Sequence, residues 1–401
     1  MREQLKLTEA ELKSGKILLP KYRALYVDQC LRDQEEILFE KNREFRALIR
    51  NMKTIEENDF EIPKGLQTKL RPYQKLGFGW LKTLYRNGFG GILADDMGLG
   101  KTLQVIVFLL SELSEAGPGE EKLTLIVAPA SLVYNWKSEI ERFAPSLSVC
   151  TITGNGAERK ELIHSLSGTQ IAVTSYDLLK RDVEEYEDIR FFCQVIDEAQ
   201  FIKNHATQGA KAVKQIHADF HIALTGTPVE NRLSELWSIF DYLMPGFLYG
   251  YQQFRQQIES PIVRSQDQEA LKKLQTMIRP FVLRRLKKDV LKDLPDKIEK
   301  NLFAELEGEQ SELYRARAQR LMMQLSRQSE DEFRDSRFQV LSELTRLRQI
   351  CCDPGLLYED YHGSAAKVEL CMELLKNALE GGHRVLLFSQ FTSMLDLLAE
   401  R

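Results

Sequence analysis

The stretch ADDMGLGKT at residues 94–102 constrains the fold more than any other part of the sequence. Its glycines, Gly98 and Gly100, let backbone N–H groups turn inward around phosphate oxygens. Lys101 is placed to reach the β- and γ-phosphates of a nucleotide, and Thr102 to offer its hydroxyl to Mg²⁺. The stretch therefore predicts a phosphate-binding P-loop. Its predicted contact residues are Asp96, Met97, Gly98, Leu99, Gly100, Lys101 and Thr102.

The sequence on either side supports this interpretation. A short apolar run at 91–93 is typical of a strand, and residues 102–113 carry an apolar stripe at helical spacing. Strand, glycine turn and helix N-terminus in this order direct the helix dipole at the phosphates. One residue departs from the general pattern, because Asp95 stands where the first glycine is expected. The alternative is a glycine-rich turn in an ordinary α/β fold.

The composition is that of a soluble globular chain with room for two or three domains: 401 residues, 43% apolar and 28% charged. With no run of eighteen apolar residues and no apolar N-terminal signal, we expect neither a membrane span nor secretion by the usual signal. Six cysteines without a CxxC pair indicate free thiols in a reducing compartment. The net charge is −4, yet residues 271–300 hold ten Lys or Arg against four Asp or Glu, which allows one basic face.

An amide side chain lies ahead of the P-loop, in the segment LRPYQKLGFGWL at residues 70–81. Pro72 can begin a helix there, because the first N–H of a helix has no partner to lose. Gln74 offers both a donor and an acceptor, which is what the edge of adenine requires. Taken alone, Gln74 would be interpreted as a surface residue. Its position ahead of a P-loop favours adenine binding.

Two adjacent carboxylates follow an apolar strand at residues 192–196. In a parallel sheet the end of this strand would lie beside the P-loop. Asp197 is then placed to hold Mg²⁺ through water, and Glu198 to polarise an attacking water. Two acids at a strand end often occur by chance. An acidic pair 96 residues after Lys101, with strands and helices between, is much rarer by chance.

Small hydroxyl residues follow the next apolar run, at residues 221–224, where the sequence continues TGTPVENR. Hydroxyls at a strand tip can hydrogen-bond the acidic pair and report the state of the γ-phosphate. The alternative is an ordinary Thr-Gly turn before a new helix. The predicted coupling residues are Gln200, Thr225, Gly226 and Thr227.

Strands alternate with helices from residue 70 to about 246, which predicts an α/β fold with a doubly wound parallel sheet and a ligand at the carboxyl ends of its strands. The pattern from 249 to 364 is mostly helical. Its paired Arg284 and Arg285 suit either phosphate binding or a solvated helix surface. A new buried strand is predicted over 382–391. The predicted domains are a charged helical lead-in (1–62), a nucleotide-binding lobe (63–246), a helical insert (247–364) and the start of a second α/β lobe (365–401).

Together, these strings resemble the Swi/Snf-type ATPases of helicase superfamily two, the DNA translocases that include chromatin remodellers and their bacterial relatives. The resemblance runs from residue 70 to 401 in the family's order: LRPYQ, DDMGLGKT, APASLVYNW, DEAQ, LTGTPVENRLSELWSI, RRLKKDV, LPDK and LLFSQF. Members of this family usually carry an acid where Asp95 stands. The departure from the general P-loop pattern therefore favours the narrower assignment.

The resemblance implies a RecA-like P-loop NTPase lobe that binds ATP and Mg²⁺ and couples hydrolysis to movement along double-stranded DNA, without separating its strands. The roles implied at the matched positions are adenine contact for Gln74, nucleotide binding for Arg71, catalysis for Lys101 and Glu198, and metal binding for Thr102 and Asp197. The resemblance also implies a brace between two lobes near the arginine pair. The residues it places near DNA are Pro129, Ser131, Trp136, Tyr176, Arg284 and Arg285. Trp136 also suits the apolar core of its own helix.

Translocases of this type have two RecA-like lobes, and the second supplies arginine fingers for phosphoryl transfer. Because the chain stops soon after the strand predicted at 382–391, we expect a truncated second lobe, nucleotide binding and little turnover by this piece alone. We also expect a monomer that does not associate with membranes and that can have protein partners. A bacterial source is favoured, for which we expect a cytoplasmic location near the nucleoid. A eukaryotic protein of this type would be nuclear. The alternatives are a nucleotide-gated binding or scaffold module, and another superfamily-two helicase that acts on RNA.

Overall fold

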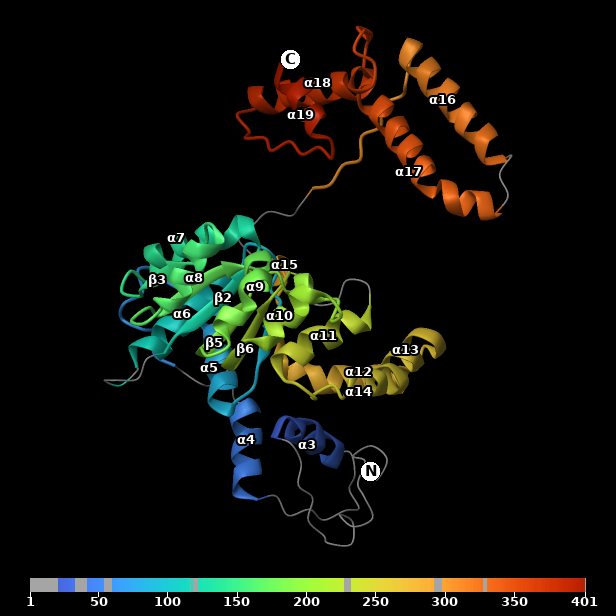
Figure 1. Cartoon of the computed structure of the whole chain (residues 1–401). Coiled ribbons are helices and arrows are strands. Elements are labelled where there is room, and N and C mark those ends of the chain that lie inside the picture. Colours follow the sequence, from blue (N-terminus) through green and yellow to red (C-terminus); the bar gives the residue numbers. More distant parts are fainter. Residues whose placement is uncertain are drawn as a thin grey trace. The chain divides into compact units, whose positions relative to one another are not determined.

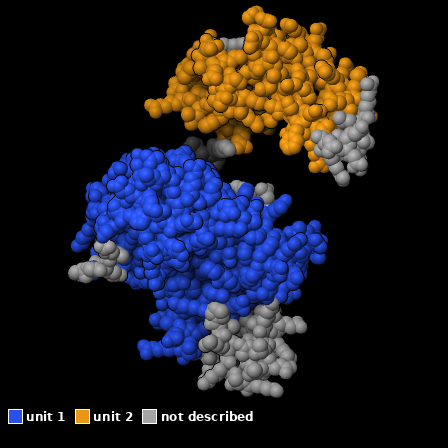
Figure 2. Space-filling view, viewed as in Figure 1, with its two compact units in different colours: residues 1–295 blue, residues 296–401 orange. Residues whose placement is uncertain are grey.

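The computed structural model of the chain describes residues 21–32, 42–53, 60–115, 117, 122–226, 232–291, 298–326 and 330–400. The chain forms two compact units, residues 1–295 and 296–401 (Figure 2). Within the described ranges, no helix combines the length and the apolar character that crossing a membrane requires.

Unit 1 is built around a sheet of seven strands in the order β3-β4-β2-β5-β6-β1-β7, and every neighbouring pair is parallel (Figure 1). This confirms the predicted parallel α/β architecture. The strands are β1 (Gly91–Leu93), β2 (Thr124–Ala128), β3 (Val149–Thr151), β4 (Ile171–Ser175), β5 (Arg190–Ile196), β6 (His217–Leu224) and β7 (Val282–Leu283).

Unit 1 also contains thirteen described α-helices, among them those that connect its strands, as parallel pairing requires. They are α3 (Ala24–Arg32), α4 (Arg43–Lys53), α5 (Pro72–Asn87), α6 (Lys101–Ser114), α7 (Val133–Phe143), α8 (Gly156–His164), α9 (Tyr176–Asp182), α10 (Gln208–Gln215), α11 (Leu233–Leu243), α12 (Tyr251–Phe254), α13 (Ser260–Ser265), α14 (Gln268–Ile278) and α15 (Lys287–Val290). A π-helical turn, Arg255–Glu259, separates α12 from α13.

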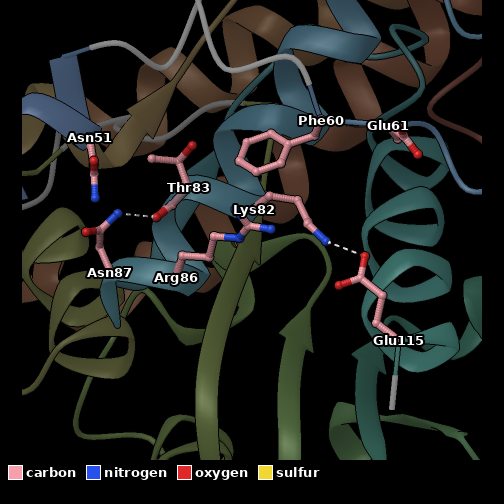
Figure 3. Close-up of a pocket in the computed structure, with 8 residues that line it drawn as sticks. All are labelled: Asn51, Phe60, Glu61, Lys82, Thr83, Arg86, Asn87 and Glu115. Carbon is pink, nitrogen blue, oxygen red and sulfur yellow. Dashed lines mark hydrogen bonds and ion pairs between the residues drawn. The ribbon is translucent and has the colours of Figure 1, made fainter. Parts of the chain in front are cut away.

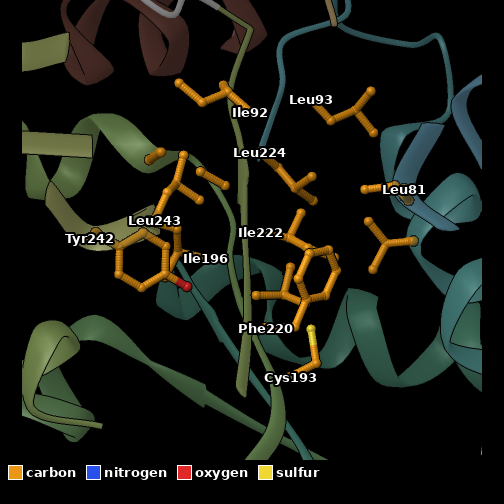
Figure 4. Packing of buried hydrophobic residues seen from close by; sticks show 14 of the residues in the cluster. Leu81, Ile92, Leu93, Cys193, Ile196, Phe220, Ile222, Leu224, Tyr242 and Leu243 are labelled. Atoms are coloured by element: carbon orange, nitrogen blue, oxygen red, sulfur yellow. The ribbon is translucent and has the colours of Figure 1, made fainter. Parts of the chain in front are cut away.

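Apolar side chains bury both faces of this sheet. Figure 4 shows Leu81 of α5 on one side of β6 and Tyr242 and Leu243 of α11 on the other. All three side chains are buried in one continuous core. The described part of the predicted lead-in joins the same core through α4, where Leu48 and Ile49 are buried. Burial on both faces explains why the strands read as continuous apolar runs.

The register brings the ends of three strands together at one edge of the sheet. Leu93 pairs with Leu224, and Ile196 pairs with Ala223, so β1, β6 and β5 end at the same level. The residues that follow these ends are the predicted P-loop, the predicted coupling residues and the acidic pair. Strand β6 lies between the other two, so the acidic pair is one strand removed from the P-loop strand rather than its direct neighbour.

A strand occurs in the segment predicted to be a helical insert. Val282 and Leu283 form β7, which pairs with Ile92 and Leu93 of β1 and completes the sheet on that side. A two-residue strand is too short to produce a period in the sequence. It is defined by its partner strand, which lies about 190 residues earlier in the chain, and it extends the first lobe beyond its predicted end at 246.

Unit 2 contains four described α-helices: α16 (Gly308–Ser326), α17 (Glu330–Cys352), α18 (Ala366–Glu380) and α19 (Thr392–Glu400). The buried Gln310 ties three of them together. Its Nε2 donates to the carbonyl oxygen of Ile350 at 2.8 Å, and its Oε1 accepts from the N–H of Ala366 at 3.1 Å. A small core of Ala365, Val368 and Met394 lies beside them.

The strand predicted over residues 382–391 is not formed. Residues 384–389 have neither helix nor strand structure, and Leu386 and Phe388 are 84% and 87% exposed rather than buried. A buried parallel strand needs a neighbour to accept its hydrogen bonds. The described residues of unit 2 provide no other strand.

Candidate nucleotide-binding site

The P-loop joins β1 to α6 through two glycines with positive φ. Gly98 has φ 84° and Gly100 has φ 75°, a conformation that L side chains rarely adopt. A Cβ on Gly100 would also lie only 2.6 Å from Nε2 of Gln74. Gly100 is therefore required both by the backbone and by the close approach of a neighbouring side chain.

Arg71 and Gln74, both predicted to bind the nucleotide, adjoin this loop. Pro72 begins α5, and the buried amide of Gln74 points back to the P-loop, where Nε2 donates to the carbonyl oxygen of Leu99 at 3.2 Å. Oε1 of Gln74 accepts from the N–H of Arg71 at 3.0 Å. The side chain of Arg71 is exposed beside it. Gln74 thus links the first turn of α5 to the phosphate-binding backbone.

Lys101 lies among carboxylates. Its Nζ donates to the carbonyl oxygen of Asp95 at 2.7 Å. Burial lowers the pKa of Lys101, and the nearby charges of Glu198, Asp95, Asp197 and Asp96 oppose that shift. A neutral carbonyl is a weak partner for a partly buried ammonium, so a phosphate oxygen would be a better one.

Asp197 is held by two aromatic side chains. Nε1 of Trp136 donates to its Oδ2 at 2.9 Å, and the Tyr176 hydroxyl donates to its carbonyl oxygen at 2.6 Å. Burial raises the pKa of Asp197, while the bond from Trp136 opposes this. Both aromatic residues are buried, Trp136 at 2% exposure, so they support the acidic pair from inside the lobe instead of offering surface to nucleic acid. Phe201 stacks on Tyr176 at 4.9 Å between ring centroids.

Glu198 has a left-handed backbone, with φ 51°. This conformation is uncommon for a residue other than glycine and often marks a functional site. Gln200 Nε2 donates to Oε2 of Glu198 at 2.8 Å, and the Thr225 hydroxyl donates to Oε1 of Gln200 at 3.3 Å. The tip of β6 is therefore linked to Glu198 through one glutamine side chain.

The remaining predicted residues are distributed as follows. Thr102 is half-buried in the first turn of α6, and the exposed Met97 lies over Gly226, whose Cβ position is 3.5 Å from Met97 Cγ. Thr227 lies outside the described residues. Pro129 is half-buried, and Ser131 and Arg284 are exposed.

Arg285 lies beside the P-loop with a partner that the sequence did not reveal. Its guanidinium pairs with the fully buried carboxylate of Asp95, which also accepts from Gln104 Nε2 at 3.2 Å. Nη1 of Arg285 donates to the carbonyl oxygen of Tyr73. Its side chain is 12% exposed, so its donors serve the P-loop and not an external phosphate. Asp95 in place of the usual glycine was the one signal that could have pointed to a buried cation.

A separate cavity of about 510 Å³ lies beside the last turns of α5 (Figure 3). Lys82 there donates to Ser111 Oγ at 2.8 Å and pairs with Glu115 at 3.0 Å. The Arg86 guanidinium lies 4.7 Å from the ring centroid of Phe60. These cations are engaged within the lobe, at the other end of α5 from Gln74, and the cavity takes no part in the site described above.

Known proteins are similar to this chain in sequence and in fold. The solved structure of a Sulfolobus solfataricus SWI2/SNF2 ATPase core in complex with dsDNA is 36% identical, with a TM-score of 0.56, and the match covers 85% of this chain and 71% of that one. A Mycoplasma pneumoniae protein named "Uncharacterized ATP-dependent helicase" is 37% identical over 98% of this chain. The Saccharomyces cerevisiae TATA-binding protein-associated factor MOT1 is 35% identical over 84% of it.

The chain spans 37% of the length of the Mycoplasma protein and 19% of that of MOT1. A family model described as "Bacterial SNF2 helicase associated" matches residues 1–63. The model described as "SNF2-related domain" matches residues 73–356, which contain the P-loop, the acidic pair and the Arg285 segment. The chain therefore belongs to the SNF2-related family.

Proposed function

We propose that unit 1 binds ATP with Mg²⁺ at the P-loop edge of its sheet, and that hydrolysis there drives movement along double-stranded DNA in the whole protein. One observation carries the proposal: β1, β6 and β5 end at the same level, which brings Lys101 of the P-loop to the same edge of the sheet as Asp197 and Glu198. A phosphate-binding lysine, a metal-binding acid and a water-polarising acid are the parts that phosphoryl transfer to water requires.

The side chains at this edge fit Mg²⁺. The Thr102 hydroxyl and the Asp197 carboxylate are hard oxygen donors, and Mg²⁺ is commonly bound by one or two carboxylates together with water and substrate phosphates. Bound there, the ion would neutralise charge that develops on the phosphates. Trp136 keeps one carboxylate oxygen of Asp197 fixed in orientation.

Glu198 is the residue we assign to the attacking water. Its backbone conformation and its bond from Gln200 fix where the carboxylate lies. Thr225, which contacts Gln200, is then placed to sense whether a γ-phosphate is present. Gln74 is assigned to adenine, and Arg71 is assigned to the bound nucleotide.

The comparison supports double-stranded DNA as the polymer, because the similar Sulfolobus core was solved in complex with dsDNA. The side chains available for it on unit 1 include Ser131, at the end of β2, and Arg284. We assign turnover and movement to the whole protein, and nucleotide binding with little turnover to this chain.

The test compares this chain with one extended through a complete second lobe, each as native protein and as Glu198→Gln. We expect all four to bind a fluorescent ATP analogue, and only the extended native chain to show ATPase activity stimulated by duplex DNA. Failure of both native chains to bind ATP would overturn the nucleotide site. Binding by both without turnover, or stimulation by RNA alone, would overturn the translocase assignment.

A further inference from the structure

A segment from late in unit 1 runs alongside the P-loop. The ladder between β1 and β7 continues past the strands, with the N–H of Ala94 donating to the carbonyl oxygen of Leu283 at 2.7 Å and the N–H of Asp96 donating to that of Arg285 at 3.0 Å. The phosphate-binding loop therefore has residues 283–287 as a fixed neighbour.

The side chain of Arg285 also holds residues 283–287 beside the P-loop. The Asp95 carboxylate accepts from the N–H of Arg285 at 3.1 Å, from its Nε at 2.9 Å, and from its Nη2. Nη2 also donates to Oε1 of Gln104 at 2.6 Å. A buried carboxylate that accepts this many hydrogen bonds fixes the position of Arg285. The position of the backbone that follows Arg285 is therefore also defined.

Lys287 is the next residue to reach the P-loop. Its N–H donates to Oδ2 of Asp96 at 2.9 Å, which fixes its backbone. Its side chain lies over the glycine turn, with Cε and Nζ both 3.4 Å from the Cβ position of Gly98. Within the described residues, no hydrogen bond or ion pair engages its Nζ. An ammonium without a protein partner is thus held beside the turn that surrounds phosphate.

The charge balance of the site calls for such a cation. Arg285 neutralises Asp95, which leaves the carboxylates of Asp96, Asp197 and Glu198 near the ammonium of Lys101. The Mg²⁺ of the proposed site would offset only part of this charge. ATP adds further negative charge at the same place. A second cation over Gly98 would offset that charge where the P-loop backbone meets the phosphates.

We propose that Lys287 binds the phosphates of ATP and that Arg285 is its positioning residue, so that the segment after β7 forms part of the nucleotide site. The inference rests on the proposed function, since it assumes that ATP occupies the P-loop. It adds a phosphate ligand that lies 186 residues beyond Lys101 in the sequence.

The test measures the affinity of this chain for a fluorescent, non-hydrolysable ATP analogue with Mg²⁺ in four forms: native, Lys287→Gln, Lys287→Arg and Lys288→Gln. Lys288 is the matched control, because it is the next residue of α15, is exposed and carries the same charge. Side-chain substitutions leave the bond from the backbone N–H of Lys287 in place, and equal melting temperatures would verify that the fold is intact.

We expect Lys287→Gln to weaken binding about tenfold or more, as the loss of a hydrogen bond between charged groups does. Lys287→Arg and Lys288→Gln should stay within about twofold of native. The proposal is overturned if Lys287→Gln binds as native does, if Lys288→Gln loses as much, or if Lys287→Arg fails to restore affinity. A native chain that binds no ATP would instead reject the proposed function itself.

Discussion

The indole N–H of Trp136 donates a 2.9 Å hydrogen bond to Oδ2 of Asp197, so α7 orients the carboxylate at the end of β5. Trp136→Phe keeps most of the packing and removes this donor. A hydrogen bond to a charged group is worth about 1.5–3 kcal/mol. We expect the variant to need roughly tenfold more Mg²⁺ for half-maximal ATP binding, measured by titration with Mg²⁺.

Ile140→Val on the same helix is the packing control, because Ile140 is buried and apolar. It should leave the Mg²⁺ requirement unchanged. An unaltered requirement in Trp136→Phe would show that the indole does not orient the metal ligand.

Asp197 should make the stability of the lobe depend on pH. Burial raises the pKa of Asp197 in the folded state, so folding favours its protonated form. The contribution of protonated Asp197 to the free energy of unfolding is complete below the unfolded-state pKa of about 3.9. It is lost as pH rises through the folded-state pKa. Relative to Asp197→Asn, the native chain should therefore lose stability as pH rises through that window. Urea unfolding of both chains at several pH values would check this. The prediction would be contradicted if the free energies of unfolding of the two chains changed with pH in the same way.

Thr225 should affect turnover without affecting nucleotide affinity. Its hydroxyl is linked to Glu198 through Gln200, and Thr225→Val removes this bond with little change of shape. A neutral hydrogen bond is worth about 1 kcal/mol, so we expect kcat of the whole protein to fall about fivefold while ATP binding holds. Thr174→Val, the same change in strand β4, is the control. An equal loss in both variants would point to general damage to the sheet.

The pair of Asp95 and Arg285 should be strongly coupled. Both side chains are largely buried, and removing one partner of a buried ion pair costs about 3–5 kcal/mol because the other charge stays unpaired. Arg285→Met should lower the free energy of unfolding by about this amount, and adding Asp95→Asn should recover part of it. Arg284→Met, at the exposed neighbour, should cost little. Urea unfolding should compare the native chain with Arg285→Met, Asp95→Asn, their double variant and Arg284→Met, and additive losses from the Arg285 and Asp95 substitutions would refute the coupling.

Local patterns predicted the framework of the site. The strand at 91–93, the glycine turn and α6 lie where the sequence indicated, because each is specified by residues within a few positions. The acidic pair also stands at a strand end, as the apolar run before it required. These features need no knowledge of distant contacts.

Partners far apart in the chain were not predictable in the same way. Trp136 meets Asp197 across 61 residues, and Arg285 meets Asp95 across 190. Hydrophobic periodicity shows which face of an element is buried, but it does not show which polar groups meet there. The segment around Phe388 was predicted as a buried strand from its apolar run, yet it is exposed. An apolar run becomes a strand only where a neighbouring strand can pair with it.

Strand β7 lies late in the sequence, so a lobe that folds on its own must extend far enough to include it. A chain cut at residue 246 would turn β1 into an edge strand, with unpaired backbone groups beside the P-loop and a tendency to associate through them. It would also lose the only cation that pairs with Asp95 among the described residues. If the chain binds ATP as proposed, its smallest self-sufficient ATP-binding piece extends to at least residue 287, beyond the helices that at first look like an insertion.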